Sequence, residues 1–433
     1  MKISIVSLFP ELYKPFLSTS LLERASDNKL VDIQITSLFS FSAAKVRVDG
    51  PAFGHGAGMV LKPEVIERAV EDTQKERGKA FKVFFSPHGT KLDQNVLATI
   101  KDKVQASDNH LMLIPARYEG IDARAEAEYA DMIISIGDYV LMGGDVPAMV
   151  LLEGLLRLIP GVVGKQESVE YESFSGPFVD WPAYTAPVEW HGNIVPEVLR
   201  SGNHKAIEEW RTQEAAKRTM IGHFDWLRTQ KLTDVQKKIA YKQIPSHYVA
   251  LMHTDVRLPH DQVGTSSVTT YDIHDIARSS RTYDLKNYFI VTPLIDQQKI
   301  VQKLLDFWSS DIGIDYNPQR HGAVSRVKLV PELTDAIEAI EAQEGKKPLV
   351  IGTSARKQDA VGKQISFHDQ GYVWSQDRPV LLLLGTAQGL SQEIIDRCDY
   401  VLSPIDGFSD FNHLSVRSAA AIIFDRWLGL NPK

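Results

Sequence analysis

Short apolar segments alternate with amphipathic segments twice along this 433-residue chain, and that alternation constrains its fold more than any other feature. In the first half, apolar segments of strand length fall at 2–8, 31–38, 82–86, 111–115 and 132–135. Segments with helical spacing fall between and after them, at 63–77, 93–104 and 148–159. Such alternation is typical of an α/β domain around a mostly parallel sheet. The sequence therefore predicts a first α/β domain over 1–164.

The second half repeats this pattern after an interruption. Residues 165–180 are polar and carboxylate-rich and predict a flexible linker, whereas 181–245 predict a small α-helical domain. Beyond them, strand-like segments fall at 248–253, 288–293, 349–352, 380–384 and 400–402, and helical ones at 297–308, 332–343, 391–397 and 415–427. A second α/β domain is therefore predicted over 246–433. Both α/β halves end in strand, glycine loop, strand, loop and Ala-rich helix, which favours two copies of one fold.

Charge, apolar runs and cysteine content exclude several classes of protein. A net charge of −7 argues against a general nucleic-acid binder, but residues 200–245 hold ten Lys or Arg against five Asp or Glu. That excess suits recognition of one structured RNA, although a solvated helix face explains it as well. The longest apolar run, 379–384, is too short for a membrane span, and the short apolar start is too short for a signal peptide. With one cysteine, Cys398, the chain is predicted to be cytoplasmic, without disulfides or a thiolate zinc site.

Three glycine-containing loops each follow an apolar strand directly, at 86–89, 117–122 and 135–148. Ligands of α/β sheets bind at such strand ends, and glycine lets the backbone approach a flat ligand such as adenine. None of the loops fits the dinucleotide or triphosphate motifs, so a conventional nucleotide-binding enzyme is disfavoured. A single loop of this kind is explained by a simple turn. Three such loops, each directly after a strand, together predict a ligand site.

Several motifs resemble those of the bacterial tRNA (guanine37-N1)-methyltransferase family of the SPOUT superfamily. They cover about 1–240 in the family's order: SLFPE (7–11), GHGAGM (54–59), SPHGTKLDQ (86–94), RYEGID (117–122), SIGDYVLMGGDVPA (135–148), IPGVVG (159–164) and SGNHKAIEEWR (201–211). The resemblance implies a deep trefoil knot, a homodimer, and knot loops that bind S-adenosyl-L-methionine. Carried over, the cofactor-binding residues are Phe85, Ser86, Pro87, Ala116, Tyr118, Glu119, Gly120, Ser135, Ile136, Gly137, Tyr139, Leu141, Gly143, Gly144 and Pro147.

The resemblance also implies two catalytic residues. Methylation at guanine N1 requires a base for the N1 proton and a cation or donor at O6, where negative charge gathers. The family's arginine on the helix after the knot matches Arg157, and its linker aspartate matches Glu172, one methylene longer. Glu170 or Asp180 are alternatives for the base.

Two further positions depart from the family's pattern. Ala116 stands where relatives often have glycine, and Ala186 replaces an arginine, which removes a possible phosphate contact. The resemblance implies that the helical domain binds the anticodon stem-loop of tRNA. It also implies use of Mg²⁺, although no metal-ligand spacing is visible.

Residues from about 246 onward resemble a second SPOUT group, of RNA methyltransferases. The motifs are HDIARSSRTY (274–283), YFIVTPL (288–294), KKPLVIGTSAR (346–356), RPVLLLLGTAQGL (378–390) and NHLSVRSAAAIIFDRWL (412–428). Ala387 and Gln388 interrupt the group's usual GTGWGL. Arg278, Arg281 and Arg356 are candidates for RNA contact or for ordinary surface roles. The implied cofactor-binding residues are Leu384, Gly385, Thr386, Gly389, Ile405, Asn412, Ser415 and Val416.

The leading interpretation is an enzyme that transfers a methyl group from S-adenosyl-L-methionine to N1 of guanine 37 in tRNA, fused to a second RNA methyltransferase domain of unknown target. The alternative is a degenerate RNA-binding scaffold without turnover. Intact RYEGID and SIGDYVL motifs favour the enzyme, whereas Glu172 and the Ala387-Gln388 pair favour the scaffold.

Overall fold

A computed structural model of the chain describes residues 1–55, 58–163, 172–356 and 362–432. It divides into two compact units, Met1–Gly176 and Pro177–Lys433, and each is described by itself. Among the described residues, no helix is both long and apolar enough to cross a bilayer.

The first unit is built on a five-stranded parallel sheet in the order β2-β1-β6-β5-β7. The apolar runs expected to form strands do so, because both faces of the sheet are covered and parallel strands of that kind are apolar throughout. β5 is longer than expected and carries the first glycine loop within it. The strands are β1 (Lys2–Ser7), β2 (Asp32–Ser37), β5 (Phe81–Lys91), β6 (His110–Ile114) and β7 (Met132–Ser135), with a small hairpin of β3 (Asp49–Pro51) and β4 (Met59–Leu61).

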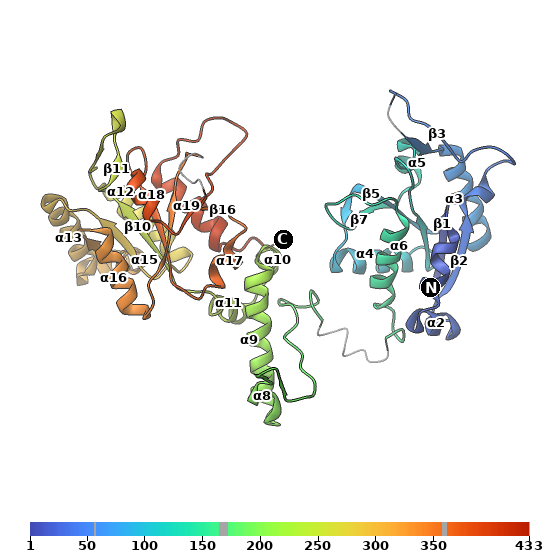
Figure 1. Cartoon of the computed structure of the whole chain (residues 1–433), viewed down its shortest axis with the longest axis horizontal. Helices are drawn as coiled ribbons and strands as arrows, with labels where there is room; N and C mark the ends of the chain where they lie inside the picture. Colours follow the sequence, from blue (N-terminus) through green and yellow to red (C-terminus); the bar gives the residue numbers. More distant parts are fainter. Residues whose placement is uncertain (56–57, 164–171, 357–361, 433) are drawn as a thin grey trace. The chain divides into compact units, whose positions relative to one another are not determined.

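Helices cover both faces of this sheet (Figure 1). α4 and α6 pack on one face, around Ile3 and Leu113, and α3 and α5 pack on the other, around Phe84 and Met112. The Asp93 side chain caps α4 by accepting a hydrogen bond from the Val96 backbone N–H. The helices are α1 (Tyr13–Leu17), α2 (Ser20–Asp27), α3 (Pro63–Arg77), α4 (Gln94–Gln105), α5 (Ala123–Tyr129) and α6 (Asp145–Leu156), with short turns η1 (Pro10–Leu12) and η2 (Leu38–Phe41).

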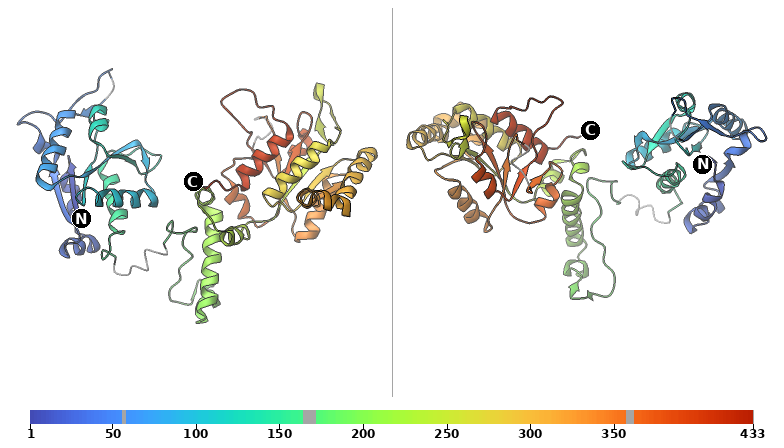
Figure 2. Two further views of the ribbon diagram at one scale, coloured as in Figure 1. Left: turned by 180° about the vertical axis from the view of Figure 1, so that it is seen from behind. Right: turned by 45° about the horizontal axis from the view of Figure 1, so that its top comes forward.

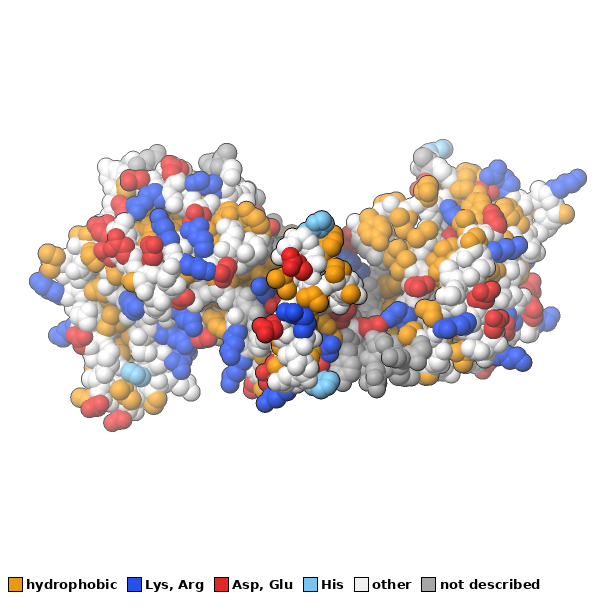
Figure 3. Space-filling model, turned by 60° about the horizontal axis from the view of Figure 1, so that its bottom comes forward, with side chains coloured by type: hydrophobic (Ala, Val, Ile, Leu, Met, Phe, Trp, Pro, Cys, Tyr) orange, Lys and Arg blue, Asp and Glu red, His pale blue; other side chains and the backbone are white. Residues whose placement is uncertain are grey.

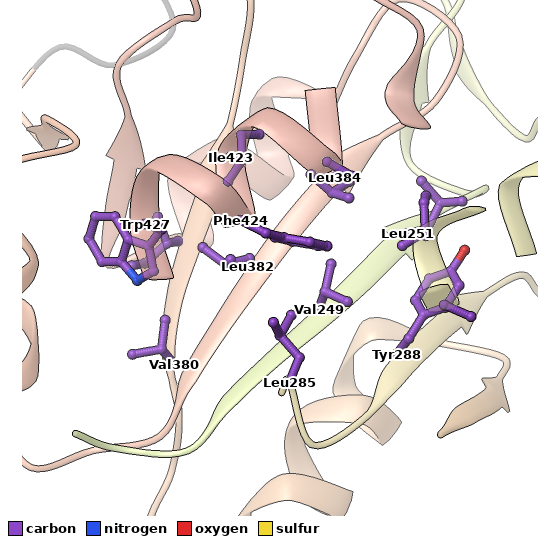
Figure 4. Packing of buried hydrophobic residues seen from close by; sticks show 14 of the residues in the cluster. Val249, Leu251, Leu285, Tyr288, Val380, Leu382, Leu384, Ile423, Phe424 and Trp427 are labelled. Carbon is purple, nitrogen blue, oxygen red and sulfur yellow. The ribbon is translucent and has the colours of Figure 1, made fainter. Parts of the chain in front are cut away.

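The second unit contains a seven-stranded parallel sheet in the order β14-β13-β10-β17-β15-β18-β16. One of its faces packs Val249 and Leu382 against Phe424 of the last helix, in a core that also contains Tyr288 and Trp427 (Figure 4). The edge strands β14 and β16 were not expected. The strands are β10 (His247–Met252), β13 (Tyr288–Val291), β14 (Val327–Val330), β15 (Leu349–Thr353), β16 (Gln364–Ile365), β17 (Val380–Gly385) and β18 (Tyr400–Leu402), with hairpins β8 (Glu189–Trp190)/β9 (Asn193–Ile194) and β11 (Val256–Arg257)/β12 (Val263–Gly264).

The helices of the second sheet form layers on both of its faces. α12 and α19 pack side by side on one face, and α16 and α18 cover the other (Figure 2). The expected helices at 297–308, 332–343, 391–397 and 415–427 are present within a few residues. These helices are α12 (Thr270–Thr282), α13 (Ile295–Ser309), α14 (Asp311–Tyr316), α15 (Pro318–Val324), α16 (Leu333–Glu344), α17 (Gln370–Trp374), α18 (Gln392–Arg397) and α19 (Val416–Leu428), with the turn η3 (Pro259–Asp261).

Both sheets share one strand order. If the edge strands β14 and β16 are set aside, the remaining strands of the second sheet run β13-β10-β17-β15-β18, which matches β2-β1-β6-β5-β7 in order along the chain. Two parallel α/β units with the same strand order agree with the expectation of two copies of one fold. The trefoil knot stays a prediction.

The helices expected between the two α/β domains belong to the second unit. Met220, Phe224, Leu227 and Ala240 are buried in the same apolar core as Val249 of the second sheet. The separate helical domain over 181–245 therefore stays a prediction, and the part of the expected linker at 165–171 lies outside the described residues. The helices of this segment are α8 (Glu197–Arg200), α9 (His204–Gly222), α10 (Phe224–Leu227) and α11 (Asp234–Tyr241).

Candidate cofactor sites

A cavity of about 410 Å³ opens at the carboxyl ends of β5, β6 and β7. The loops after these strands come together there, since the Gly144 backbone N–H donates to the Ala116 carbonyl at 2.7 Å. All fifteen residues expected to bind cofactor in the first domain line this cavity, although their role stays a prediction. Further lining residues that sequence reasoning missed are His88, Ile121, Glu126, Ile134 and Val140.

Glycine is required at one point of the wall. A Cβ atom at Gly144 would lie 2.8 Å from the Ala116 backbone nitrogen and 2.9 Å from Cα of Pro115. Neither backbone atom can move without shifting the end of β6. Gly144 therefore allows the second and third loops to approach each other.

An ion pair between a partly buried arginine and a buried aspartate lies next to the lining residues Ala116 and Gly144, and the sequence did not single it out. Asp145, at the start of α6, accepts hydrogen bonds from the Arg117 guanidinium (2.6 Å), the Tyr13 hydroxyl (2.9 Å) and the Ser7 hydroxyl (2.5 Å). Burial, and next the negative charge of Asp145, raise the pKa of Tyr13 well above its usual range, so its hydroxyl remains a donor. The sequence feature that could have revealed this ion pair is Asp145 itself, a charged residue at the start of an otherwise apolar helix.

A second polar pair lies in the cavity wall itself. The Ser86 hydroxyl is 2.7 Å from Nδ1 of His88, and Nε2 of His88 is 3.7 Å from a carboxylate oxygen of Glu126. Burial raises the pKa of Glu126, and the nearby His88 partly offsets that increase. The Glu126 carboxyl in this wall therefore keeps its proton to a higher pH than an exposed glutamate does.

The two residues expected to be catalytic lie together but outside the cavity. Arg157 caps the end of α6, and its guanidinium forms an ion pair with the carboxylate of Glu172. Gly144 and Pro147 line the cavity at the start of the same helix, which is about 18 Å long at about 1.5 Å per residue. Within one chain, this pair is therefore remote from the cavity. Of the alternative bases, Glu170 lies outside the described residues and Asp180 belongs to the second unit.

A larger cavity, of about 800 Å³, opens at the corresponding place in the second unit. It lies at the carboxyl ends of β15, β17 and β18 and beside the start of α19. All eight residues expected from the second resemblance line it, and their cofactor role stays a prediction. Arg356 also lines this cavity, whereas Arg281 donates to the Gly322 carbonyl and Arg278 is exposed.

Hydroxyl groups and a histidine lie under the second cavity. Thr386 donates to the Met252 carbonyl (2.8 Å), Ser266 lies 2.6 Å from the Thr386 hydroxyl, and Nδ1 of His253 lies 3.0 Å from the Ser266 hydroxyl. Burial lowers the pKa of His253 to about 4, so the imidazole is neutral at physiological pH. Sequence reasoning identified Thr386 but missed His253 and Ser266.

Two further features shape the second cavity. Ala387 has a φ of 51°, in the left-handed region that favours glycine. Asp272 lines the wall and accepts a hydrogen bond from Thr269 at 2.6 Å, with the Arg417 guanidinium 3.6 Å away. In the residues that the structure describes, no group of three or more metal-ligating side chains is present in either unit.

Comparison with protein families identifies both halves. Residues 1–229 match a family model described as tRNA (guanine-1)-methyltransferase TrmD. The chain belongs to this tRNA (guanine-1)-methyltransferase family. Residues 246–429 match a second model, described as a SAM-dependent RNA methyltransferase.

Curated members of the tRNA (guanine-1)-methyltransferase family share this arrangement. Proteins named tRNA (guanine-N(1)-)-methyltransferase from Nitratidesulfovibrio vulgaris and Oleidesulfovibrio alaskensis are 36% and 37% identical, over 99% of both chains in each case. A protein of the same name from Thermus thermophilus is 42% identical, over 51% of this chain and 89% of its own. Relatives therefore occur with and without the second half. Their names favour an enzyme over the degenerate scaffold.

Proposed function

We propose that the chain transfers a methyl group from S-adenosyl-L-methionine to N1 of guanine 37 in tRNA, beside the anticodon. The observation that supports this most is the convergence of three family motifs on one cavity of the first unit. Cytoplasmic location is part of the proposal. A requirement for Mg²⁺ also stays a prediction, and no step is assigned to it.

The first cavity suits the cofactor. A volume of about 410 Å³ falls in the usual range for small-molecule sites. Backbone groups exposed by Gly120, Gly137 and Gly144 offer donors and acceptors to an adenine ring, and Ile136 and Leu141 offer apolar contact. When bound, S-adenosyl-L-methionine supplies an electrophilic methyl group.

The chain's own residues provide the acid–base chemistry. The Glu172 carboxylate accepts the proton from guanine N1, which turns a poor nucleophile into a good one. The Arg157 guanidinium stabilises the negative charge that gathers on O6 of guanine. Their ion pair holds both groups in one place before the substrate enters, and it opens to admit the base.

A second copy of the chain completes the site. The Arg157–Glu172 pair and the cavity lie at opposite ends of α6 in one chain, so the pair of one protomer has to serve the cavity of its partner. Tyr139, Val140, Leu141 and Met142, at the mouth of the cavity, are large apolar side chains at least 42% exposed. An apolar patch of this kind is typical of a protein interface and supports a homodimer.

The helical segment and the second unit serve RNA in this proposal. α9 follows the SGNH motif, and its Arg211 guanidinium stacks on Trp181, 4.9 Å from the ring centre. Cationic and aromatic side chains of this kind suit the anticodon stem-loop. The second cavity binds a second S-adenosyl-L-methionine for methylation of an RNA.

The test is mass spectrometry of tRNA incubated with the full chain and S-adenosyl-L-methionine. The wild type should form 1-methylguanosine at position 37, and Glu172→Gln should reduce that rate by about 10²-fold, the scale of lost general-base catalysis. Cofactor affinity should hardly change, because Glu172 is assigned to the guanine and is not among the residues expected to bind the cofactor. Glu153→Gln, an exposed carboxylate on α6, is the matched control and should keep full activity.

A different modified base, or no modification, contradicts the proposed reaction. Activity of Glu172→Gln within a few-fold of wild type would move the base to Glu170, Asp180 or water.

A further inference from the structure

The amino-terminal ends of the strands in the second sheet carry a row of cations. Lys286 lies two residues before β13, Arg326 lies directly before β14, and Lys346 and Lys347 lie just before β15. Because the strands are parallel, these residues come together along the side of the sheet where the strands begin. The second cavity lies at the opposite side, about 20 Å away along a six-residue strand.

Helix α11 adds two more cations at the same side. Lys238, Tyr241 and Lys242 share one side of this helix, at the spacing i, i+3 and i+4. The Tyr241 hydroxyl donates to the Asp284 carbonyl at 2.5 Å, two residues before Lys286. The Arg326 guanidinium donates to the Asp284 carboxylate at 2.8 Å and to the Leu285 carbonyl at 2.7 Å, which places it at the same turn.

These six residues, Lys238, Lys242, Lys286, Arg326, Lys346 and Lys347, form what we call the basic edge. Arg326 pairs with Asp284 and Lys346 with Asp377, but no ion pair joins the other four to a described residue. Those four lysines are exposed. Figure 3 views the chain from below and shows blue Lys and Arg side chains spread over the second unit. The chain as a whole carries −7, so this surface differs from the average.

We propose that the basic edge binds the sugar–phosphate backbone of the tRNA whose anticodon arm the helical segment holds. This inference rests on the proposed function, because it takes tRNA as the substrate. α11 packs against α9, and its Ala240 is buried in the core of the second sheet, so α9 and the basic edge belong to one unit. Flexible lysine side chains suit phosphates rather than bases. The second unit thus contributes to binding the substrate of the first.

The test measures binding of a tRNA transcript to the full chain at several salt concentrations. The double variant Lys242→Glu/Lys286→Glu changes one lysine of the basic edge at the end of α11 and one lysine just before β13. We expect tRNA affinity to fall at least about tenfold and the slope of log K against log salt to decrease by about 0.9 for each lost phosphate contact. Lys242→Gln/Lys286→Gln should give a smaller loss in the same direction.

The matched control is Lys299→Glu/Lys303→Glu on α13, which makes the same change in net charge on an exposed helix. If this control weakens tRNA binding as much as the edge variant, the basic edge is not the site. If the wild type methylates tRNA and the edge variant has an unchanged KM for tRNA, this inference fails and the proposed function stands. If the wild type neither binds nor methylates tRNA, both fail.

Discussion

The first and second cavities lie at equivalent places in sheets of one strand order, yet the groups beneath them differ. Beside the first, the buried carboxylate of Asp145 pairs with the partly buried guanidinium of Arg117. Under the second, Thr386, Ser266 and His253 form a neutral chain of hydroxyl groups and an imidazole. Topology therefore decides where a cavity opens, whereas the side chains below it decide how that cavity responds to protons.

Acid should destabilise the second unit strongly. Burial lowers the pKa of both His247 and His253 to about 4, whereas an unfolded histidine has a pKa of about 6.5. Between these values the unfolded chain binds more protons, so stability is full above pH 6.5 and is lost as the pH falls toward 4. The loss approaches about 3 kcal/mol for each histidine at pH 4.

Tryptophan fluorescence during urea unfolding measures this loss in one unit, because all seven tryptophans lie in the second unit. His247→Gln keeps an acceptor for the indole N–H groups of Trp374 and Trp427 and should remove about half of the pH dependence. His204→Gln, at an exposed position, should leave the dependence unchanged. A urea midpoint that does not vary between pH 6.5 and 4.5 would contradict burial of neutral His247 and His253 as a source of acid sensitivity in the second unit.

A matched pair of glycine substitutions should separate the two cavities. A Cβ at Gly385 would lie 2.6 Å from the Leu390 backbone nitrogen, much as one at Gly144 would meet Ala116. Crowding of this kind costs at least about 1.4 kcal/mol, so each alanine variant should lose about tenfold in cofactor affinity at its own cavity only. Calorimetry with S-adenosyl-L-methionine measures both sites. Gly222→Ala, which meets no atom within 4 Å, is the control, and a variant that weakens both sites would show that the cavities are coupled.

The smallest effect is expected at Ala387. Its left-handed backbone costs an alanine about 1 kcal/mol relative to glycine. Because a bound ligand has to hold the loop in this conformation, Ala387→Gly should raise affinity at the second cavity by at most about fivefold. Ala355 lines the same cavity without a positive φ, and Ala355→Gly should bring no such gain. Equal results for the two variants in the same calorimetric titration would mean that strain at Ala387 does not limit binding.

The central strands could be predicted from the sequence because they are buried on both faces. Residues 380–384 are apolar throughout and form β17. β14 has the sequence VKLV and lies at an edge, where one side is less covered and the apolar signal is weak. The partner of the helical segment was missed for a different reason. Periodicity shows that Phe224 and Leu227 have to be buried, but it does not show which core receives them.

The candidate sites were predictable where glycine was needed and less so elsewhere. Loops at strand ends must expose backbone, so Gly144 and Gly385 could be identified from their positions alone. Asp145 bonds to Ser7, 138 residues away, and Ser266 beside His253 lies against Thr386, 120 residues away, so only the folded chain brings these groups together. The Arg157–Glu172 pair came from family resemblance. The helix expected at 148–159 already separates Arg157 from the loop at 135–148, but only the folded chain shows that Arg157 pairs with Glu172.

The core shared by the helical segment and the last helix has a consequence for synthesis of the protein on the ribosome. Met220, Phe224 and Ala240 emerge long before Trp427, which completes their core roughly 190 residues later, or about 10–40 s at bacterial elongation rates. The first unit contains its own strands and helices and is free to fold during that interval. The helical segment has to wait with apolar side chains exposed. A nascent chain stalled before residue 427 should therefore present a finished first cavity and helices that chaperones still recognise.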